Sequence, residues 1–432
     1  MMMIGESAPV SAGASSGGFI TPAYRWGFAL IVSLFFLWAL ANNLNDILIR
    51  QFQKALGLNR AQAGFIQFVF YIGYFVVALP AGLLMRRFGY RAGVLTGLLL
   101  YATGAALFYP ASLMLSFGAF LFALFLIAAG AACLETTANV YTAEFGSAQT
   151  TVQRLNLAQA FNGLGASIAP VLGGLLIFSG VEHSAAQVAA MTQVKRAAYR
   201  VAEASTVQLP YALLAVAALA VAGAVAIVRL PAMRKSQDTP LRAQMAELAQ
   251  CKSLSGAVVA QFFYVGAQVG IWSYFIDFVK DVTPWVSERQ GAYLLSLSLV
   301  LFMIGRFSGT ALMARIRPPV LLGGYALANI ALCAVAAMAP GWIALVALVL
   351  TSFFMSIMFP TIFGLGVAPL GAARPLGSSF IIMAIIGGAL FPPLMGLIAV
   401  RAGSIAPALF LPLLAFVVIA VYAFRLKSDK TA

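Results

Sequence analysis

The stretch FFLWALANNLNDIL, residues 35–48, ends a long apolar run with three amides and a carboxylate. An apolar run of about 20 residues is long enough to cross a bilayer as a helix. Similar runs recur along the whole chain, because 62% of its 432 residues are hydrophobic and only 9% are charged. Soluble domains carry about 25% charged residues. We therefore expect a membrane protein, and the composition excludes a soluble enzyme.

Glycines, prolines and charged clusters divide the apolar runs into twelve expected membrane-spanning helices. The first six are expected at 23–49, 62–85, 92–109, 113–141, 154–178 and 209–230, and the second six at 255–280, 291–313, 318–339, 341–368, 373–399 and 405–425. Gly165 and Pro170 of the fifth helix recur as Gly387 and Pro392 of the eleventh. This repeat favours an all-α membrane protein with two pseudo-symmetric six-helix bundles.

The expected organisation has five parts. They are a disordered cytoplasmic tail at 1–22, an N-terminal bundle at 23–230, a central cytoplasmic loop at 231–254, a C-terminal bundle at 255–425 and a cytoplasmic tail at 426–432. Lys and Arg are more frequent in the loops on the side of both termini, which predicts cytoplasmic termini. The net charge of +14 is scattered between apolar runs. This pattern suits loops facing anionic membrane lipid, and no nucleic acid is expected as a partner.

Asp46 belongs to the first polar cluster. Asn42, Asn45 and Asp46 share one helix face, Trp38 lies one turn earlier on the same stripe, and Asn43 lies beside it. Ionisable groups inside a membrane are costly and are functional candidates by default. The alternative is a polar cluster in the outer headgroup layer, because Asp46 is near the end of its span.

Glu135 lies in the segment CLETTAN, residues 133–139, with Asn139 one turn later. Apolar residues surround it, so its charged form requires a partner or a proton. A structural salt bridge to an arginine is the alternative. Mid-span arginines are nearly absent, and the exception, Arg306, is expected at the cytoplasmic end of its span.

Two further helices carry polar stripes. The stripe of the fifth is Asn156, Gln159 and Asn162, and that of the seventh is Gln261, Tyr264, Gln268 and Trp272. Amides pair with hydroxyl groups and aromatic rings pack on C–H faces, so the mixture suits a sugar. Helix–helix hydrogen bonding is the plainer explanation for any single amide.

No cofactor and no metal site are expected, since Cys133, Cys251 and Cys333 lie far apart without metal-ligand spacing. His183, the sole histidine, falls in an outer loop. If protons drive this protein, carboxylates must carry them.

These segments resemble the major facilitator superfamily, specifically its fucose–proton symporter family, along nearly the whole chain. The most specific are FFLWALANNLNDIL, CLETTAN and RLNLAQAFNGLGA, the last at residues 154–166. The loop GLLMRRFGYR, residues 82–91, resembles the superfamily's signature between spans two and three, but it has Met85 where an acidic or amide residue is common.

The resemblance implies a twelve-helix, two-bundle fold that imports a monosaccharide with a proton by alternating access. It implies that Asp46 and Glu135 couple protons, and that Asn43, Gln159 and Asn162 contact the sugar, with Gln268 and Trp272 as partners across the cavity. Taken together with the polar stripes, the expected substrate-binding residues are Trp38, Asn42, Asn43, Glu135, Asn139, Gln159, Asn162, Tyr264, Gln268 and Trp272. L-fucose is the preferred substrate, with glucose/galactose or N-acetylglucosamine permeases of the family as alternatives. A monomer in a bacterial inner membrane is expected.

Three rival functions would make different demands on the same residues. An efflux pump for amphipathic cations would prefer a greasy cavity with few amides. A membrane enzyme would need a nucleophile–base pair or metal ligands at membrane depth, which the sequence does not offer. A non-transporting sugar receptor stays open as the alternative of another class.

Overall fold

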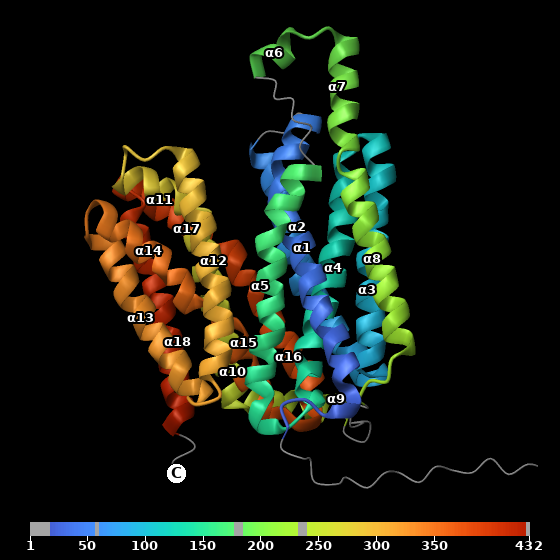
Figure 1. Cartoon of the computed structure of the whole chain (residues 1–432), viewed down its shortest axis with the longest axis vertical. Helices are drawn as coiled ribbons and strands as arrows, with labels where there is room; N and C mark the ends of the chain where they lie inside the picture. Colours follow the sequence, from blue (N-terminus) through green and yellow to red (C-terminus); the bar gives the residue numbers. More distant parts are fainter. Residues whose placement is uncertain (1–17, 57–59, 177–184, 232–239, 429–432) are drawn as a thin grey trace, which may run out of the picture.

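The computed structural model describes residues 18–56, 60–176, 185–231 and 240–428. Every regular element in these ranges is a helix (Figure 1). The long helices of the first half are α1 (Arg25–Leu56), α2 (Arg60–Phe88), α3 (Tyr90–Met114), α4 (Phe117–Tyr141), α5 (Thr151–Leu176) and α8 (Gln208–Ile227). Those of the second half are α10 (Lys252–Ser273), α12 (Glu288–Leu312), α13 (Pro318–Met338), α14 (Gly341–Met355), α15 (Met358–Val367), α16 (Arg374–Met383), α17 (Gly387–Ala402) and α18 (Phe410–Ser428).

The helices account for twelve membrane crossings. Ten stretches of the described residues are long and apolar enough to cross a membrane. One of them, Gly341–Ala402, spans 62 residues and holds two crossings, α14–α15 and α16–α17. They are separated by a short 3-10 helix in which Gly371 has φ +48°, a conformation that glycine adopts readily. The twelfth crossing is α5, which packs along α1 and α12.

Local sequence explains several helix ends. Ser116 caps α4 by accepting a hydrogen bond from the Ala119 N–H. Ser287 and Gln290 form a reciprocal capping box at the start of α12. At the end of α17, Gly403 takes the left-handed conformation that commonly stops a helix.

The long helices form two bundles side by side, one from each half of the sequence (Figure 1). Two short helices before α8, α6 (Ala185–Ala190) and α7 (Gln193–Ser205), lie at one end of the molecule, which we call the α7 end. Another short helix, α9 (Leu241–Gln250), lies at the opposite end, where α1 begins and α18 finishes. We call this the α9 end.

The bundles touch each other toward the α9 end, where α2 packs on α16 and α5 packs on α12 and α15. Two amides of α5 cross this junction: Gln153 Nε2 donates to the Thr310 carbonyl at 3.1 Å and Asn156 Nδ2 donates to Thr361 Oγ1 at 3.2 Å. Nearby, Arg374 pairs with Glu144 at 3.1 Å. These contacts join the two halves and close this side.

Gly82 permits the tightest of these approaches. A Cβ on this residue of α2 would lie 2.7 Å from the Pro375 carbonyl oxygen and would also overlap the Ser379 side chain of α16. Only glycine lets α2 and α16 come this close. The backbone of the signature-like loop segment is therefore part of the contact between the bundles.

The expected connections contain more structure than their polarity suggested. Within the segment 231–254, which was expected as a loop, residues 241–250 form α9, in which Gln244 is buried and accepts a hydrogen bond from Arg86 Nε at 2.9 Å. The segment 179–208 carries α6 and α7. Residues 1–17 of the expected N-terminal tail lie outside the described residues, and α18 runs on to Ser428.

Candidate functional site

A cavity of 610 Å³ lies between the two bundles. This volume falls in the range of small-molecule sites. Its wall on α12 is lined by Leu295, Leu299, Phe302 and Arg306. Leu295 and Arg306 are eleven positions apart, which corresponds to about 16 Å along the helix axis. Because α12 runs from the α7 end to the α9 end, Arg306 lies deepest, next to the junction of the bundles.

The wall from the first half is formed by α1, α2, α4 and α5. Trp38, Asn42 and Asn43 line it from α1, and Tyr71 and Tyr74 from α2. The side chain of Asn42 donates to the Tyr74 hydroxyl at 3.2 Å, and its own Oδ1 has no hydrogen-bond partner among the described residues. Asn42 therefore lines the cavity with one buried acceptor unused.

Glu135 presents the only described carboxylate on the cavity wall. Its side chain is 7% exposed and lies opposite the Tyr74 hydroxyl, with which it interacts. The chain Asn42–Tyr74–Glu135 therefore connects three polar side chains from α1, α2 and α4. A proton gained or lost at Glu135 would therefore affect the interactions of Tyr74 and Asn42.

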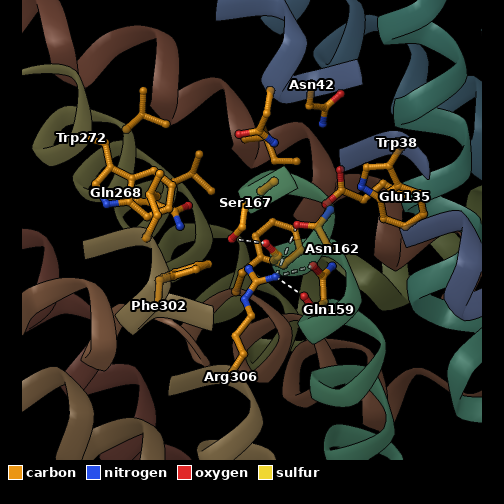
Figure 2. A pocket seen from close by; sticks show the side chains of 18 of the residues that line it. Trp38, Asn42, Glu135, Gln159, Asn162, Ser167, Gln268, Trp272, Phe302 and Arg306 are labelled. Atoms are coloured by element: carbon orange, nitrogen blue, oxygen red, sulfur yellow. Dashed lines mark hydrogen bonds between the residues drawn. The ribbon is translucent and has the colours of Figure 1, made fainter. Parts of the chain in front are cut away.

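The opposite wall combines amide and aromatic groups (Figure 2). Gln268 and Trp272 face the cavity from α10. The Trp272 ring meets Phe302 edge-on with centroids 5.1 Å apart, and its Nε1 donates to Ser352 Oγ at 3.0 Å. These contacts hold the indole rigidly against the cavity. Gln268 makes no side-chain hydrogen bond to the other described residues, so its amide is free to bind a ligand.

The side chain of Arg306, which belongs to the second half, contacts α5 of the first half at the cavity floor (Figure 2). It is only 4% exposed, and its Nη1 donates to the Gln159 carbonyl, to Gln159 Oε1 at 3.3 Å and to Asn162 Oδ1 at 3.4 Å. Its Nε donates to the Ser356 carbonyl at 3.1 Å. The guanidinium also lies 4.5 Å above the Phe302 ring and interacts electrostatically with Glu135.

Arg306 lies in the last third of α12, toward the α9 end, and its side chain faces the cavity. It is a buried cation on the cavity wall and was not among the expected site residues. The signal was present: Arg306 is a charged residue inside an apolar helix, and such residues rarely face lipid.

Eight of the ten expected substrate-binding residues line the cavity together. They are Trp38, Asn42, Asn43, Glu135, Gln159, Asn162, Gln268 and Trp272. The other two lie just beneath its floor. Asn139 is buried and accepts a hydrogen bond from Gln159 Nε2 at 3.1 Å, and the Tyr264 hydroxyl donates to the Met355 carbonyl at 3.1 Å. Neither lines the cavity; Asn139 holds the amide of Gln159, which does, and Tyr264 holds the backbone of Met355.

Asp46 belongs to α1, but its side chain lies outside the described residues. The side chain of Asn45 also lies outside the described residues. The proposed role of Asp46 in proton coupling therefore rests on its sequence position alone.

The chain matches the sequence profile of the Major Facilitator Superfamily over residues 28–379. It is 45% identical to the L-fucose-proton symporter of Escherichia coli strain K12, with 93% of each chain covered. It is 34% identical to the L-fucose-proton symporter of Haemophilus influenzae, with 92% and 96% covered. It is 36% identical to the glucose/galactose transporter of Brucella abortus, with 92% and 94% covered.

The fold agrees with solved structures. The crystal structure of the transporter FucP in the outward conformation matches with a TM-score of 0.87 and 45% identity, covering 93% of this chain and 98% of that one. A bacterial homologue of the iron transporter ferroportin in an outward-facing state matches with a TM-score of 0.73 at 12% identity, which concerns the fold alone.

The predicted all-α, twelve-helix fold and the resemblance found in the sequence are both confirmed. The relatives are transporters, and the chain is not an enzyme. It is a multi-pass membrane protein that belongs to the major facilitator superfamily, in the branch of the fucose–proton symporters.

Proposed function

We propose that this chain is a proton-coupled importer of a neutral monosaccharide, with L-fucose as its preferred substrate. The observation that carries the proposal is the cavity between the bundles, in which amides and two tryptophans surround one buried carboxylate. The names of its relatives in E. coli and H. influenzae, at 45% and 34% identity, support L-fucose as the sugar.

The cavity's chemistry fits a sugar better than a greasy or ionic substrate. Asn42, Gln159, Asn162 and Gln268 offer amide donors and acceptors on both walls. Trp38 and Trp272 offer flat apolar faces for the C–H face of a pyranose ring. A neutral, hydroxyl-rich ring would use both kinds of group at once.

Proton coupling is assigned to Glu135 and Asp46. Glu135 lines the cavity, so a bound sugar and a bound proton act on the same side chain. By linkage, each then changes the other's affinity by the same factor. Asp46 lies toward the α7 end of α1, where it would load a proton from outside.

Arg306 links sugar binding to the junction of the bundles. It belongs to α12, yet it is bonded to Gln159 and Asn162 of α5 at the cavity floor. Alternating access requires α12 and α5 to separate on this side. A sugar that competes for Gln159 and Asn162, or a change in the charge of Glu135, would weaken the hydrogen bonds between Arg306 and α5.

The arrangement corresponds to an outward-facing state. The bundles are joined at the α9 end, and the basic loops of this end suit the cytoplasm. The similarity to a transporter solved in the outward conformation supports this assignment. Both termini then lie in the cytoplasm of a bacterial inner membrane, and the cavity of a single chain suffices for transport by a monomer surrounded by lipid.

The proton gradient is strong enough for concentrative uptake. One charge crossing 100 mV yields about 2.3 kcal/mol. A total driving force of roughly 150 mV then supplies about 3.5 kcal/mol, which sustains an accumulation of a few hundred-fold. About one proton per sugar is sufficient.

Uptake by reconstituted protein tests this function. Proteoliposomes with an inward proton gradient are offered labelled L-fucose, D-glucose, D-galactose and N-acetylglucosamine. We expect accumulation of L-fucose above its external concentration, and its loss with a protonophore. Preferred uptake of glucose and galactose would reassign the chain to the other branch. Binding of sugar without uptake or counterflow would make it a receptor.

A further inference from the structure

A second cavity opens far from the sugar site, at the α9 end of the second bundle. It has a volume of 640 Å³ and lies between α10 and α18, next to the end of α9. Its wall from α9 and α10 includes Gln250, Lys252, Ser255 and Val259, and its wall from α18 includes Val418, Tyr422 and Arg425. No group of the proposed transport mechanism contributes to it.

The helices α10 and α18 run in opposite directions, and residues of the same kind lie opposite each other along this groove. Gly256 and Tyr422 are opposite each other, because a Cβ on Gly256 would lie 2.9 Å from the tyrosine ring. Counting outward from this pair, Lys252 and Arg425 fall together at the α9 end. Val259 and Val418 fall together toward the bilayer centre.

The groove is therefore graded from basic to apolar over a short distance. Lys252 and Val259 are seven positions apart in the sequence, as are Arg425 and Val418, which corresponds to about 10 Å of helix. Val259 is 47% exposed and Val421 is 45% exposed. In a membrane-spanning chain, these valines face acyl chains.

The basic end has binding capacity that the protein itself leaves unused. Neither Lys252 nor Arg425 forms an ion pair with an acidic residue in the described part of the chain. Lys252 begins α10, a helix of 22 residues whose start has no side-chain cap. Its first N–H groups and its dipole favour an anion.

Tyr422 forms the inner wall of the groove. Tyr422 is 7% exposed and lines the groove beside Ser253. Its hydroxyl faces the Ser253 side chain but makes no hydrogen bond of good geometry within the described residues. Tyr422 therefore closes the inner wall of the groove between its basic and apolar ends.

We propose that this groove binds one anionic phospholipid, with the headgroup phosphate between Lys252 and Arg425 and an acyl chain along Val259, Val418 and Val421. Charge complementarity selects an anionic over a zwitterionic headgroup. The apolar end selects a lipid over a free phosphate ion. A lipid in this groove would contact both α10 and α18 at the α9 end. The helix α10 also carries Gln268 and Trp272 of the sugar cavity.

Lipid binding to the purified full-length protein tests this site. Native mass spectrometry measures the affinities for phosphatidylglycerol and phosphatidylcholine. The double variant Lys252→Ala/Arg425→Ala is expected to bind phosphatidylglycerol about 30-fold more weakly, since each cation contributes about 1 kcal/mol toward anionic lipid. Its affinity for phosphatidylcholine is expected to stay within about twofold of wild type.

The matched control is Arg315→Ala/Arg317→Ala, which removes two exposed cations between α12 and α13 on the same face. It is expected to keep the wild-type affinity for phosphatidylglycerol. Equal losses in both double variants would reduce the effect to general surface charge and overturn the site. Unchanged binding in Lys252→Ala/Arg425→Ala would do the same.

A third variant separates lipid from free anion. Val259→Trp fills the apolar end without changing charge, and its exposed position tolerates the larger side chain. It is expected to weaken phosphatidylglycerol binding at least tenfold. If it binds phosphatidylglycerol normally while millimolar inorganic phosphate displaces the lipid, the site is an anion site and the lipid assignment fails. Circular dichroism of each variant verifies its helical fold, and none of these readouts depends on sugar transport.

Discussion

Gln159 and Asn162 are the residues for which the structure makes the clearest claim about sugar binding. Both line the cavity floor one turn apart on α5, and Arg306 fixes the orientation of their amides. Leaving a sugar hydroxyl unpaired in a closed cavity costs about 1–3 kcal/mol. Alanine at either position is therefore expected to weaken sugar binding by about tenfold or more, measured by calorimetry.

Gln208 offers the matched control for these two variants. It is also an amide at a helix position, but it bonds to Ser112 Oγ at 2.7 Å and does not line the cavity. Gln208→Ala should bind sugar as wild type does. Equal affinities in all three variants would mean that the α5 stripe only packs helices.

Arg306 is expected to need its guanidinium and not only its charge. Its Nη1 donates to Gln159 and Asn162 of α5 while its Nε donates to the Ser356 carbonyl of the second half, and a single ammonium group cannot reach both sides with the same geometry. Arg306→Lys is expected to lower sugar affinity and the initial rate of uptake about tenfold or more, because charge-assisted hydrogen bonds contribute about 1.5–3 kcal/mol each. Wild-type affinity and uptake in both Arg306→Lys and Arg306→Ala would remove Arg306 from the site.

Glu135 is expected to make sugar affinity depend on pH. It is a buried acid on the cavity wall, so sugar occupancy and protonation influence each other. Glu135→Gln keeps the size of the side chain and removes the titration. We expect this variant to bind sugar with an affinity that is nearly constant between about pH 5 and 8, a range in which wild type varies. Superimposable affinity–pH curves for the two proteins would leave coupling to Asp46 alone.

Sequence reasoning at the residue scale identified faces of helices better than depth along them. Tyr264, Gln268 and Trp272 share a face of α10 as expected, but only the last two reach the cavity. Asn139 follows Glu135 by one turn and falls beneath the floor. The helical periodicity of a sequence predicts on which face of the helix a side chain lies. The depth at which the opposite bundle closes the cavity depends on packing between segments far apart in the chain.

At the scale of helices, the contact of α2 with α16 decides whether the α9 end can close. Gly82→Ala introduces a Cβ about 2.7 Å from the Pro375 carbonyl oxygen, so the two helices must move apart. We expect uptake to fall at least fivefold, because overpacking costs about 1–3 kcal/mol in the closed arrangement. The measurement is initial uptake in proteoliposomes at equal protein content.

Gly223→Ala is the control for this change. Gly223 lies in α8, where an added Cβ would meet nothing within 4 Å. Its uptake should match wild type. Normal uptake by Gly82→Ala would show that α2 and α16 tolerate a wider spacing and that this contact does not limit transport.

The helices themselves were largely predictable, because long apolar runs dominate the chain. The expected span at 318–339 corresponds to α13 (Pro318–Met338), and the one at 291–313 to α12. The helix α9 was not predicted. Its polar sequence shows no long apolar run, and its position depends on Gln244 meeting Arg86 of α2. Short helices fixed by tertiary contacts escape sequence periodicity.

At the scale of the whole molecule, the sequence repeat predicts two bundles but not which side of the junction is closed. The same chain must visit both arrangements during alternating access, and their free energies differ by only a few kcal/mol. Contacts such as Glu144–Arg374, Gln153–Thr310 and Asn156–Thr361 select the arrangement closed at the α9 end. None of these pairs is recognisable from spacing along the sequence.

The most direct test of the account is whether sugar and proton cross together. L-fucose is added to proteoliposomes in a lightly buffered medium, and external pH and labelled sugar are followed simultaneously. We predict external alkalinisation of about one proton per sugar taken up. We also predict that Asp46→Asn exchanges sugar without this signal. Sugar uptake by wild type with no change in external pH, or a wild-type proton signal from Asp46→Asn, would contradict the account.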